Sequence, residues 1–256
     1  MQRNYELIDI YLQTGEVPDH WIYQLIQEGC RPAVVEPLPI DTLSELYAET
    51  KAKLEPFEPL NEDLWIRIFG PTAIPDTVTV WLLVGAPKGL EAVVRLDESG
   101  NKHLIVDLGQ ICTYSDSVPR LLNIVFDFFT HELAHVLVGQ KYKYTTTMSR
   151  EQLLKQLAFD EGIAHFLSFE EDVLEVDWNS EDMQARKKAA FQRFHFFMEN
   201  AKELTFQDLK RANTGDFWDK FASIAGMFAL VDYCQNEGNL EHLLSDGPKF
   251  LVEFIG

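Results

Sequence analysis

His131-Glu132-Leu133-Ala134-His135 forms an H-E-x-x-H motif within a long apolar segment. In an α-helix, residues four apart lie on the same face, one turn above the other. Two imidazoles in that arrangement can bind one zinc ion, and the glutamate between them can reach a metal-bound water. The motif therefore predicts a metal-binding helix and hydrolysis by a metal-activated water.

The sequence on both sides of the motif is typical of a buried helix. Residues 121–130 read LLNIVFDFFT, and residues 136–139 read VLVG. Pro119 suits the first turn of this helix and Gly139 suits its C-terminal stop. Two histidines and a glutamate in such surroundings are costly unless they are paired or bound to metal. A pair of hydrogen-bonded core histidines is the alternative interpretation.

Composition limits the classes of partner. The chain has 256 residues, enough for one large domain or two small ones, and a formal net charge of −19. This charge argues against nucleic-acid binding and against docking on a membrane of anionic lipid. It would favour cationic partners or peptides, although a solvated acidic surface also explains it. We expect a peptide or protein substrate, and the oligomeric state stays open.

Cysteine usage and the N-terminus bear on localisation. The chain has no C-x-x-C pair and no disulfide framework, because its three cysteines are far apart: Cys30, Cys112 and Cys234. The first residues, MQRNYE, lack the basic and apolar regions of a signal peptide. We therefore expect a cytoplasmic protein.

The hydrophobic pattern predicts an α+β fold. Residues 1–60 are expected to form an N-terminal helical segment, in which a helix capped by Asp41 runs through Lys53. Residues 61–256 are expected to form the catalytic domain, with a small, mostly antiparallel sheet at 64–108 and a helical half at 118–256. The predicted strands are residues 64–69, 77–84, 92–96 and 103–108, with a turn at 97–101.

The strand at residues 103–108 has two interpretations. In many zinc peptidases a sheet edge beside the metal helix pairs with an extended substrate. Residues 104–109 would then form the substrate cradle. The alternative is an ordinary internal strand.

A catalytic zinc needs three protein ligands and an open position for water. The metzincin form H-E-x-x-H-x-x-G-x-x-H is excluded, because Val138 and Lys141 occupy the positions of its glycine and third histidine. A thiolate from Cys112 is a second route. Its surroundings, GQICT at residues 109–113, lack the E-G-C pattern of peptide deformylases.

A glutamate from a downstream helix is the third route, and four candidates follow the motif: Glu151, Glu161, Glu170 and Glu171. Glu161 is favoured because its flanks in FDEGIAHFL, residues 159–167, are apolar. Gly162 and Ala164 are small and would let this helix approach the metal helix closely. Glu151 stands at a polar helix start, where it suits the helix dipole. The other two candidates belong to a solvated acidic segment.

HELAH at residues 131–135, followed by DEGIAH at 160–165, resembles the gluzincins of the peptidase MA type. The resemblance covers residues 120–250, and it extends weakly to the C-terminal stretches 226–233 and 236–244. It implies a thermolysin-like catalytic core and a zinc-dependent peptidase. It also implies one Zn²⁺ held by His131, His135 and Glu161, with Glu132 as the general base.

The residue that would stabilise the oxyanion departs from the family pattern. Residues 217–224 read FWDKFASI and contain no tyrosine. His165 lies one turn after Glu161, so it could be this catalytic donor, a partner that orients a ligand, or a core histidine. Other candidate donors are Tyr142, Tyr144 and Tyr233, and candidate partners of the ligand imidazoles are Asp127 and Asp160. A second helix histidine, His195, is better explained by packing.

Two functions therefore compete. The first is an active zinc metallopeptidase. The alternative is a catalytically inactive gluzincin-like scaffold that acts as a peptide- or protein-binding module. The intact Glu132 favours the enzyme, because binding alone has no need of a general base.

Overall fold

The computed structural model describes residues 1–34, 37–71, 77–169 and 172–255, apart from the side chains of 251–253. The chain is a mixed α and β protein that divides into two compact units. Unit 1 comprises Met1–Pro59 and Ile74–Leu133, and unit 2 comprises Leu60–Ala73 and Ala134–Gly256. Helix α6, Val118–Lys141, is continuous and contributes to both. The expected domain boundary at residue 60 stays a prediction.

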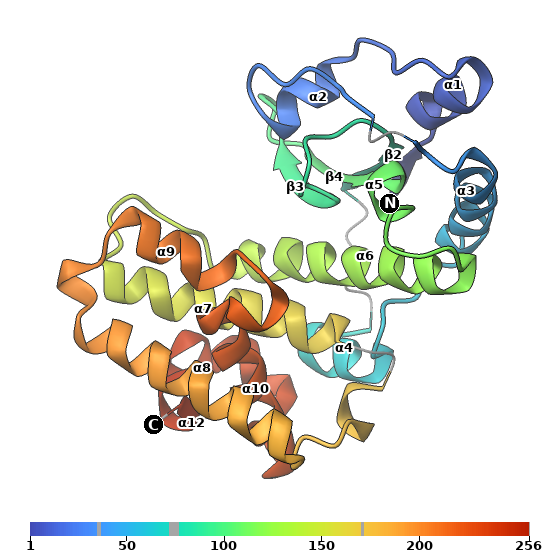
Figure 1. Ribbon diagram of the computed structural model, residues 1–256. Coiled ribbons are helices and arrows are strands. Elements are labelled where there is room, and N and C mark those ends of the chain that lie inside the picture. The colour runs from blue at the N-terminus through green and yellow to red at the C-terminus, as the bar shows by residue number, and fades with distance from the viewer. Residues whose placement is uncertain (35–36, 72–76, 170–171, 256) are drawn as a thin grey trace. The chain divides into compact units, whose positions relative to one another are not determined.

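The sheet lies in unit 1 and has the order β1-β2-β4-β3 (Figure 1). Its strands are β1 Gln2–Asn4, β2 Val78–Leu83, β3 Ala92–Leu96 and β4 Lys102–Asp107. Strands β1 and β4 both pair parallel with β2, whereas β3 pairs antiparallel with β4. The expectation of a mostly antiparallel sheet is therefore wrong. Strand β1 of the sheet comes from the N-terminal segment, which was expected to be helical. Strand β4 lies between β2 and β3.

Three of the four predicted strands are confirmed, and the turn at residues 97–101 joins β3 to β4. Asp97 N–H donates to the carbonyl of Asn101 at 3.0 Å, which closes the hairpin. Gly100 has a φ of 81°, a left-handed conformation that favours glycine. The local turn chemistry thus explains why this hairpin could be predicted.

The predicted strand at residues 64–69 is wrong, because this segment belongs to helix α4, Glu62–Phe69, in unit 2. Leu64, Trp65 and Ile68 are buried along one helical face. Two acidic residues stand in the first turn, and Gly70, with φ 91°, ends the helix. In a run this short, an apolar pattern does not separate a helix from a strand.

Unit 1 contains the helices α1 Glu6–Thr14, α2 Trp21–Ile26, α3 Ile40–Leu54 and α5 Leu108–Ile111. Helices α1, α2 and α5 contact the sheet, and α3 packs on α5. One buried cluster joins Leu7 of α1 and Ile22 of α2 to Trp81 and Ile105 of the sheet. Helix α3 buries Leu43, Leu46 and Tyr47, the apolar face that its spacing predicts. Its N-cap is Pro39, so Asp41 lies in the first turn and is not the cap.

Helix α6 carries the H-E-x-x-H motif and has the buried character that its sequence predicts. Pro119 lies in the first turn, but the helix continues past Gly139 to Lys141. By length and composition alone α6 could cross a membrane, yet 61% of its most apolar window is buried inside the protein. It is a weak membrane candidate, because the core helix of a soluble protein passes the same test.

Unit 2 is helical in the residues that the structure describes. Its longer helices after α6 are α7 Arg150–Ser168, α8 Glu181–Glu199, α9 Phe206–Asn213, α10 Phe221–Gln235 and α12 Pro248–Ile255. Helix α7 begins with a capping box between Ser149 and Gln152. It packs on the buried helix α10 through Gly162, where an added Cβ would lie 2.6 Å from the backbone carbon of Gly226. Gly162 therefore allows the close approach of α7 to α10, and its expected part in the approach to the metal helix stays a prediction.

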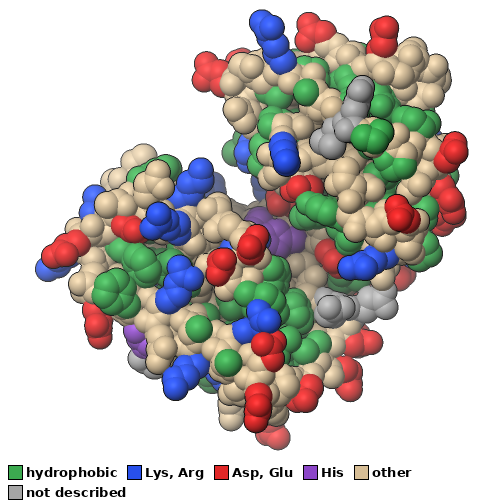
Figure 2. Space-filling model, viewed as in Figure 1, with side chains coloured by type: hydrophobic (Ala, Val, Ile, Leu, Met, Phe, Trp, Pro, Cys, Tyr) green, Lys and Arg blue, Asp and Glu red, His purple; other side chains and the backbone are tan. Residues whose placement is uncertain are grey.

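Charged side chains of both signs lie on the face of the molecule drawn in Figure 2. On the face drawn in Figure 2, acidic and basic side chains are interspersed on both units.

Candidate metal centre

Two helices bring the three predicted ligands together. His131 and His135 lie one turn apart on α6, and Glu161 comes from α7. One ligand atom from each lies within 4.8 Å of the others, and His135 Nε2 is 3.8 Å from Glu161 Oε1. Tetrahedral zinc with ligand bonds of about 2.0–2.2 Å holds such atoms about 3.3–3.6 Å apart. Small side-chain movements would therefore complete a zinc site, and the donor set of two imidazoles and one carboxylate suits zinc.

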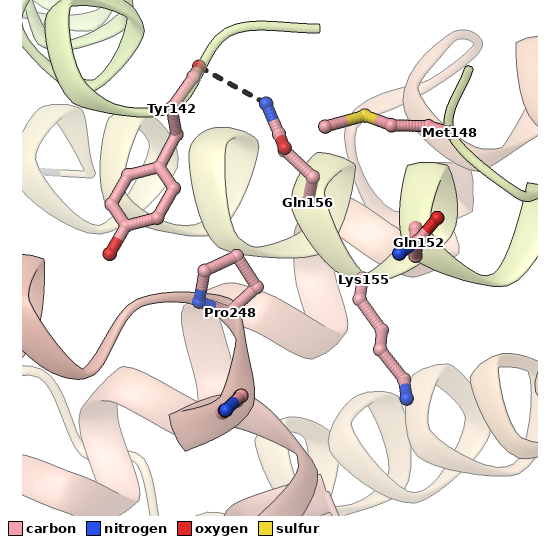
Figure 3. A pocket seen from close by; sticks show the side chains of 7 residues that line it. Tyr142, Met148, Gln152, Lys155, Gln156 and Pro248 are labelled. Carbon is pink, nitrogen blue, oxygen red and sulfur yellow. Dashed lines mark hydrogen bonds between the residues drawn. The ribbon is translucent and has the colours of Figure 1, made fainter. Parts of the chain in front are cut away.

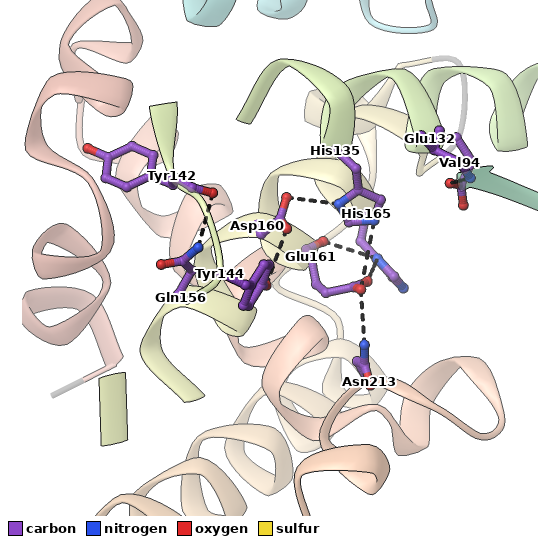
Figure 4. A network of polar contacts seen from close by, with 10 residues as sticks. All are labelled: Val94, Glu132, His135, Tyr142, Tyr144, Gln156, Asp160, Glu161, His165 and Asn213. Carbon is purple, nitrogen blue, oxygen red and sulfur yellow. Dashed lines mark hydrogen bonds and ion pairs between the residues drawn. The ribbon is translucent and has the colours of Figure 1, made fainter. Parts of the chain in front are cut away.

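An acidic side chain orients one of these imidazoles (Figure 4). His135 Nδ1 lies 2.8 Å from Oδ1 of Asp160. This contact favours the tautomer with its proton on Nδ1, in which Nε2 is the nitrogen that can bind a metal. Asp127 lies one turn before His131 on α6.

The same aspartate has a tyrosine partner. Tyr144 donates its hydroxyl to Oδ2 of Asp160 at 3.2 Å. Although Tyr144 is 49% exposed, desolvation of its hydroxyl, followed by the nearby Asp160 and Glu161 charges, raises its pKa, so the hydroxyl remains a donor at neutral pH. Tyr144 thus contacts the carboxylate that faces the candidate ligand His135, and its hydroxyl is engaged there.

The carboxylate of Glu161 has a second neighbour that the sequence did not indicate. Asn213, at the end of α9, donates its amide to Oε1 of Glu161 at 3.2 Å. This is the oxygen that faces His135. Because Asn213 lies far along the chain and belongs to no motif, only the packing of α9 against α7 could reveal it.

His165 lies one helical turn after Glu161 on α7 and is only 3% exposed. Its Nδ1 is 3.1 Å from the carbonyl of Glu161 and 3.6 Å from Oε2, and its ring packs on Phe217. Burial lowers the pKa of His165 to about 3, with Lys220 and His135 adding to the effect. The ring is therefore neutral at pH 7, and its Nδ1–H donates to the backbone. This geometry favours a positioning role over that of an oxyanion donor.

The candidate general base contacts the edge of the sheet in unit 1. Oε2 of Glu132 accepts a hydrogen bond of 2.9 Å from the backbone N–H of Val94 in β3. The expected cradle at residues 104–109 is wrong, because β4 is an internal strand and Leu108 and Gly109 belong to α5. The edge strand beside Glu132 is β3.

The other candidate third ligands have different environments. Cys112 is buried, and burial raises the pKa of its thiol to about 12. Glu151 is exposed and pairs with Lys155 at 2.6 Å, as expected of a residue in the first turn of a helix. Glu170 and Glu171 lie outside the described residues.

The remaining candidates make structural contacts. Tyr142 donates its hydroxyl to the carbonyl of Leu244, and Tyr233 donates to that of Asn239. His195 Nε2 lies 2.6 Å from the carbonyl of Ile255, in agreement with the packing interpretation.

A cavity of about 580 Å³ lies elsewhere in unit 2 (Figure 3). Tyr142, Met148 and Pro248 form apolar parts of its wall, and Lys155 and Lys249 add charge. None of the candidate metal ligands lines it, so this cavity does not contribute to the candidate site.

Comparison with known proteins adds no relative. No family model matches the chain, and neither a curated protein nor a solved structure is significantly similar to it. The functional assignment therefore depends on the chemistry of the site itself.

Proposed function

We propose that the protein is a zinc-dependent peptidase with a thermolysin-like catalytic core. One Zn²⁺ would be held by His131, His135 and Glu161. The observation that carries the proposal is the approach of these three donors, together with the aspartate on His135. Chance placement of two histidines rarely provides a third donor and an orienting carboxylate as well.

Each residue has a distinct role in this proposal. Zinc, when bound, acts as a Lewis acid on the scissile carbonyl and lowers the pKa of water. Glu132 accepts the proton of the attacking water and transfers it to the leaving amine. Asp160 keeps Nε2 of His135 directed at the metal position. Asn213 restrains the carboxylate of Glu161 through its amide.

The edge strand β3 offers a place for the substrate. Val94 N–H already contacts the carboxylate of Glu132, so a peptide along β3 would pass beside the general base. An extended peptide adds to a sheet edge through backbone hydrogen bonds. The substrate is therefore proposed to be an extended peptide or an unfolded protein segment.

The proposal is tested by metal content and cleavage together. Zinc-loaded wild type is compared with Glu132→Gln on a broad peptide library, with products identified by mass spectrometry. We expect equal zinc in both, and a rate that is about 10²–10⁴-fold lower in Glu132→Gln. His131→Ala should lose both zinc and cleavage.

The outcome also separates the alternative function. Zinc binding without cleavage by either form would reject the peptidase and favour a peptide-binding scaffold. Failure of the wild type to bind zinc would reject both metal-dependent interpretations.

A further inference from the structure

Arg95 of the edge strand β3 binds two backbone carbonyls. Its Nη1 donates to the carbonyl of Val94 at 3.1 Å, and its Nε donates to that of Ile26 at 3.3 Å. Among the residues that the structure describes, no carboxylate lies within ion-pair distance of this guanidinium. The side chain is half-buried. In a chain of net charge −19, this arginine is therefore a cation that forms no ion pair with the described carboxylates.

Arg95 binds the backbone carbonyl of Val94, which a substrate strand would need for pairing. Val94 lies opposite Leu104 of β4, and its N–H and C=O are bound by Glu132 and Arg95, neither of which belongs to the neighbouring strand. In an antiparallel sheet, a residue whose N–H and C=O are not bound by its existing neighbour strand can form both hydrogen bonds with a strand added on the other side. A peptide that pairs at Val94 must therefore displace Glu132 from the N–H and the guanidinium from the carbonyl.

A carboxylate is the group best able to do this. Arginine binds a carboxylate through charge-assisted, often bidentate hydrogen bonds, which are about twice as strong as bonds between neutral groups. Because Arg95 is half-buried and forms no ion pair with the described carboxylates, a carboxylate that reaches its guanidinium gains more than it would on an open surface. A neutral or cationic peptide side chain offers no such exchange.

We propose that Arg95 selects peptides with an acidic side chain next to the residue that pairs with Val94. The substrate carboxylate binds the guanidinium of Arg95. The carbonyl of Val94 is then released to accept a hydrogen bond from the substrate backbone. This inference rests on the proposed peptidase function. It is opposite to the preference for basic peptides that the overall charge would favour.

The test uses matched peptides that differ only by Glu or Gln at each position around a cleaved bond. Zinc-loaded wild type should cleave the Glu peptide with a kcat/KM about tenfold higher at one position, and high salt should weaken this preference. Arg95→Gln should cleave both peptides equally. Arg120→Gln removes the same charge from an exposed position of α6 and should retain the preference.

Two results would overturn the inference while leaving the peptidase in place: equal cleavage of both peptides by wild type, or a Glu preference that persists in Arg95→Gln. If wild type cleaves nothing, the proposed function fails, and the same labelled peptides are measured for binding by fluorescence anisotropy. A Glu preference in binding that disappears in Arg95→Gln would support the role of Arg95. Equal binding of both peptides would reject it.

Discussion

Nδ1 of His135 lies 2.8 Å from Oδ1 of Asp160, the residue directly before Glu161. Helix α7 therefore supplies both a candidate metal ligand and the carboxylate that contacts the candidate ligand His135 of α6. Neighbouring residues on a helix point in different directions, so Asp160 and Glu161 can reach opposite sides of one imidazole. His135 Nε2 faces Glu161 at 3.8 Å, which agrees with this arrangement.

Replacement of Asp160 tests this relationship. Asp160→Asn keeps the shape of the side chain but removes the charge that fixes the tautomer of His135. We expect zinc affinity to fall by about 10–100-fold, because carboxylate partners of ligand histidines contribute on that scale. Tyr144→Phe removes only the hydroxyl on the far oxygen of Asp160 and should cost less. Competition titration with a chromophoric chelator measures both, and unchanged affinity in Asp160→Asn would exclude the orienting role.

The contact between α7 and α10 predicts a large loss of stability. A Cβ at Gly226 would lie 1.9 Å from the carbonyl oxygen of Ala158. Gly226→Ala should reduce the free energy of unfolding by about 1–3 kcal/mol or more, because backbone rather than a flexible side chain must move. Gly139→Ala is the control, since nothing lies within 4 Å of its added Cβ. It should be neutral or stabilising by up to about 1 kcal/mol. Urea denaturation compares the two.

Buried His165 predicts an acid-sensitive fold. Its folded pKa of about 3 lies below the usual value of 6.5, so protonation favours the unfolded chain. Its contribution to stability is complete above pH 6.5 and is lost progressively as the pH falls toward 3. Between pH 7 and pH 5 the loss should be about 2 kcal/mol. Urea denaturation in EDTA should show a correspondingly weaker pH dependence in His165→Phe, and an identical dependence would contradict the assignment.

Metal binding should stabilise the folded chain. Free zinc at about 100 times its dissociation constant adds about 2.7 kcal/mol to the free energy of unfolding. The melting temperature of wild type should therefore rise with zinc and fall again with EDTA. His135→Ala and Glu161→Ala should lose this response. A zinc-dependent rise that persists in both variants would place the metal elsewhere.

Local chemistry explains which elements could be predicted. The β3–β4 hairpin follows from Asp97 and Gly100, and the start of α7 follows from Ser149 and Gln152. The approach of His131 and His135 follows from helical periodicity alone. These features depend on residues close together in sequence, so a single chain is enough to indicate them.

Long-range packing explains the elements and contacts that the sequence did not predict. The N-terminal residues 2–4 form β1 because β2 offers a parallel partner about which the local sequence carries no information. Leu64 to Phe69 are helical because Leu64, Trp65 and Ile68 find a buried helical face. Asn213 reaches Glu161 only through the packing of α9 on α7. Such contacts depend on tertiary structure that overrides local preference.

The most direct test of the central claim is anomalous diffraction at the zinc edge from crystals of the zinc-loaded protein. The account predicts one strong peak bound by His131, His135 and Glu161, at about 2.0–2.2 Å from each ligand atom. The Glu161→Ala protein, crystallised in the same way, should lose this peak. A zinc peak bound by other residues, or none at these three, would contradict the proposed metal centre.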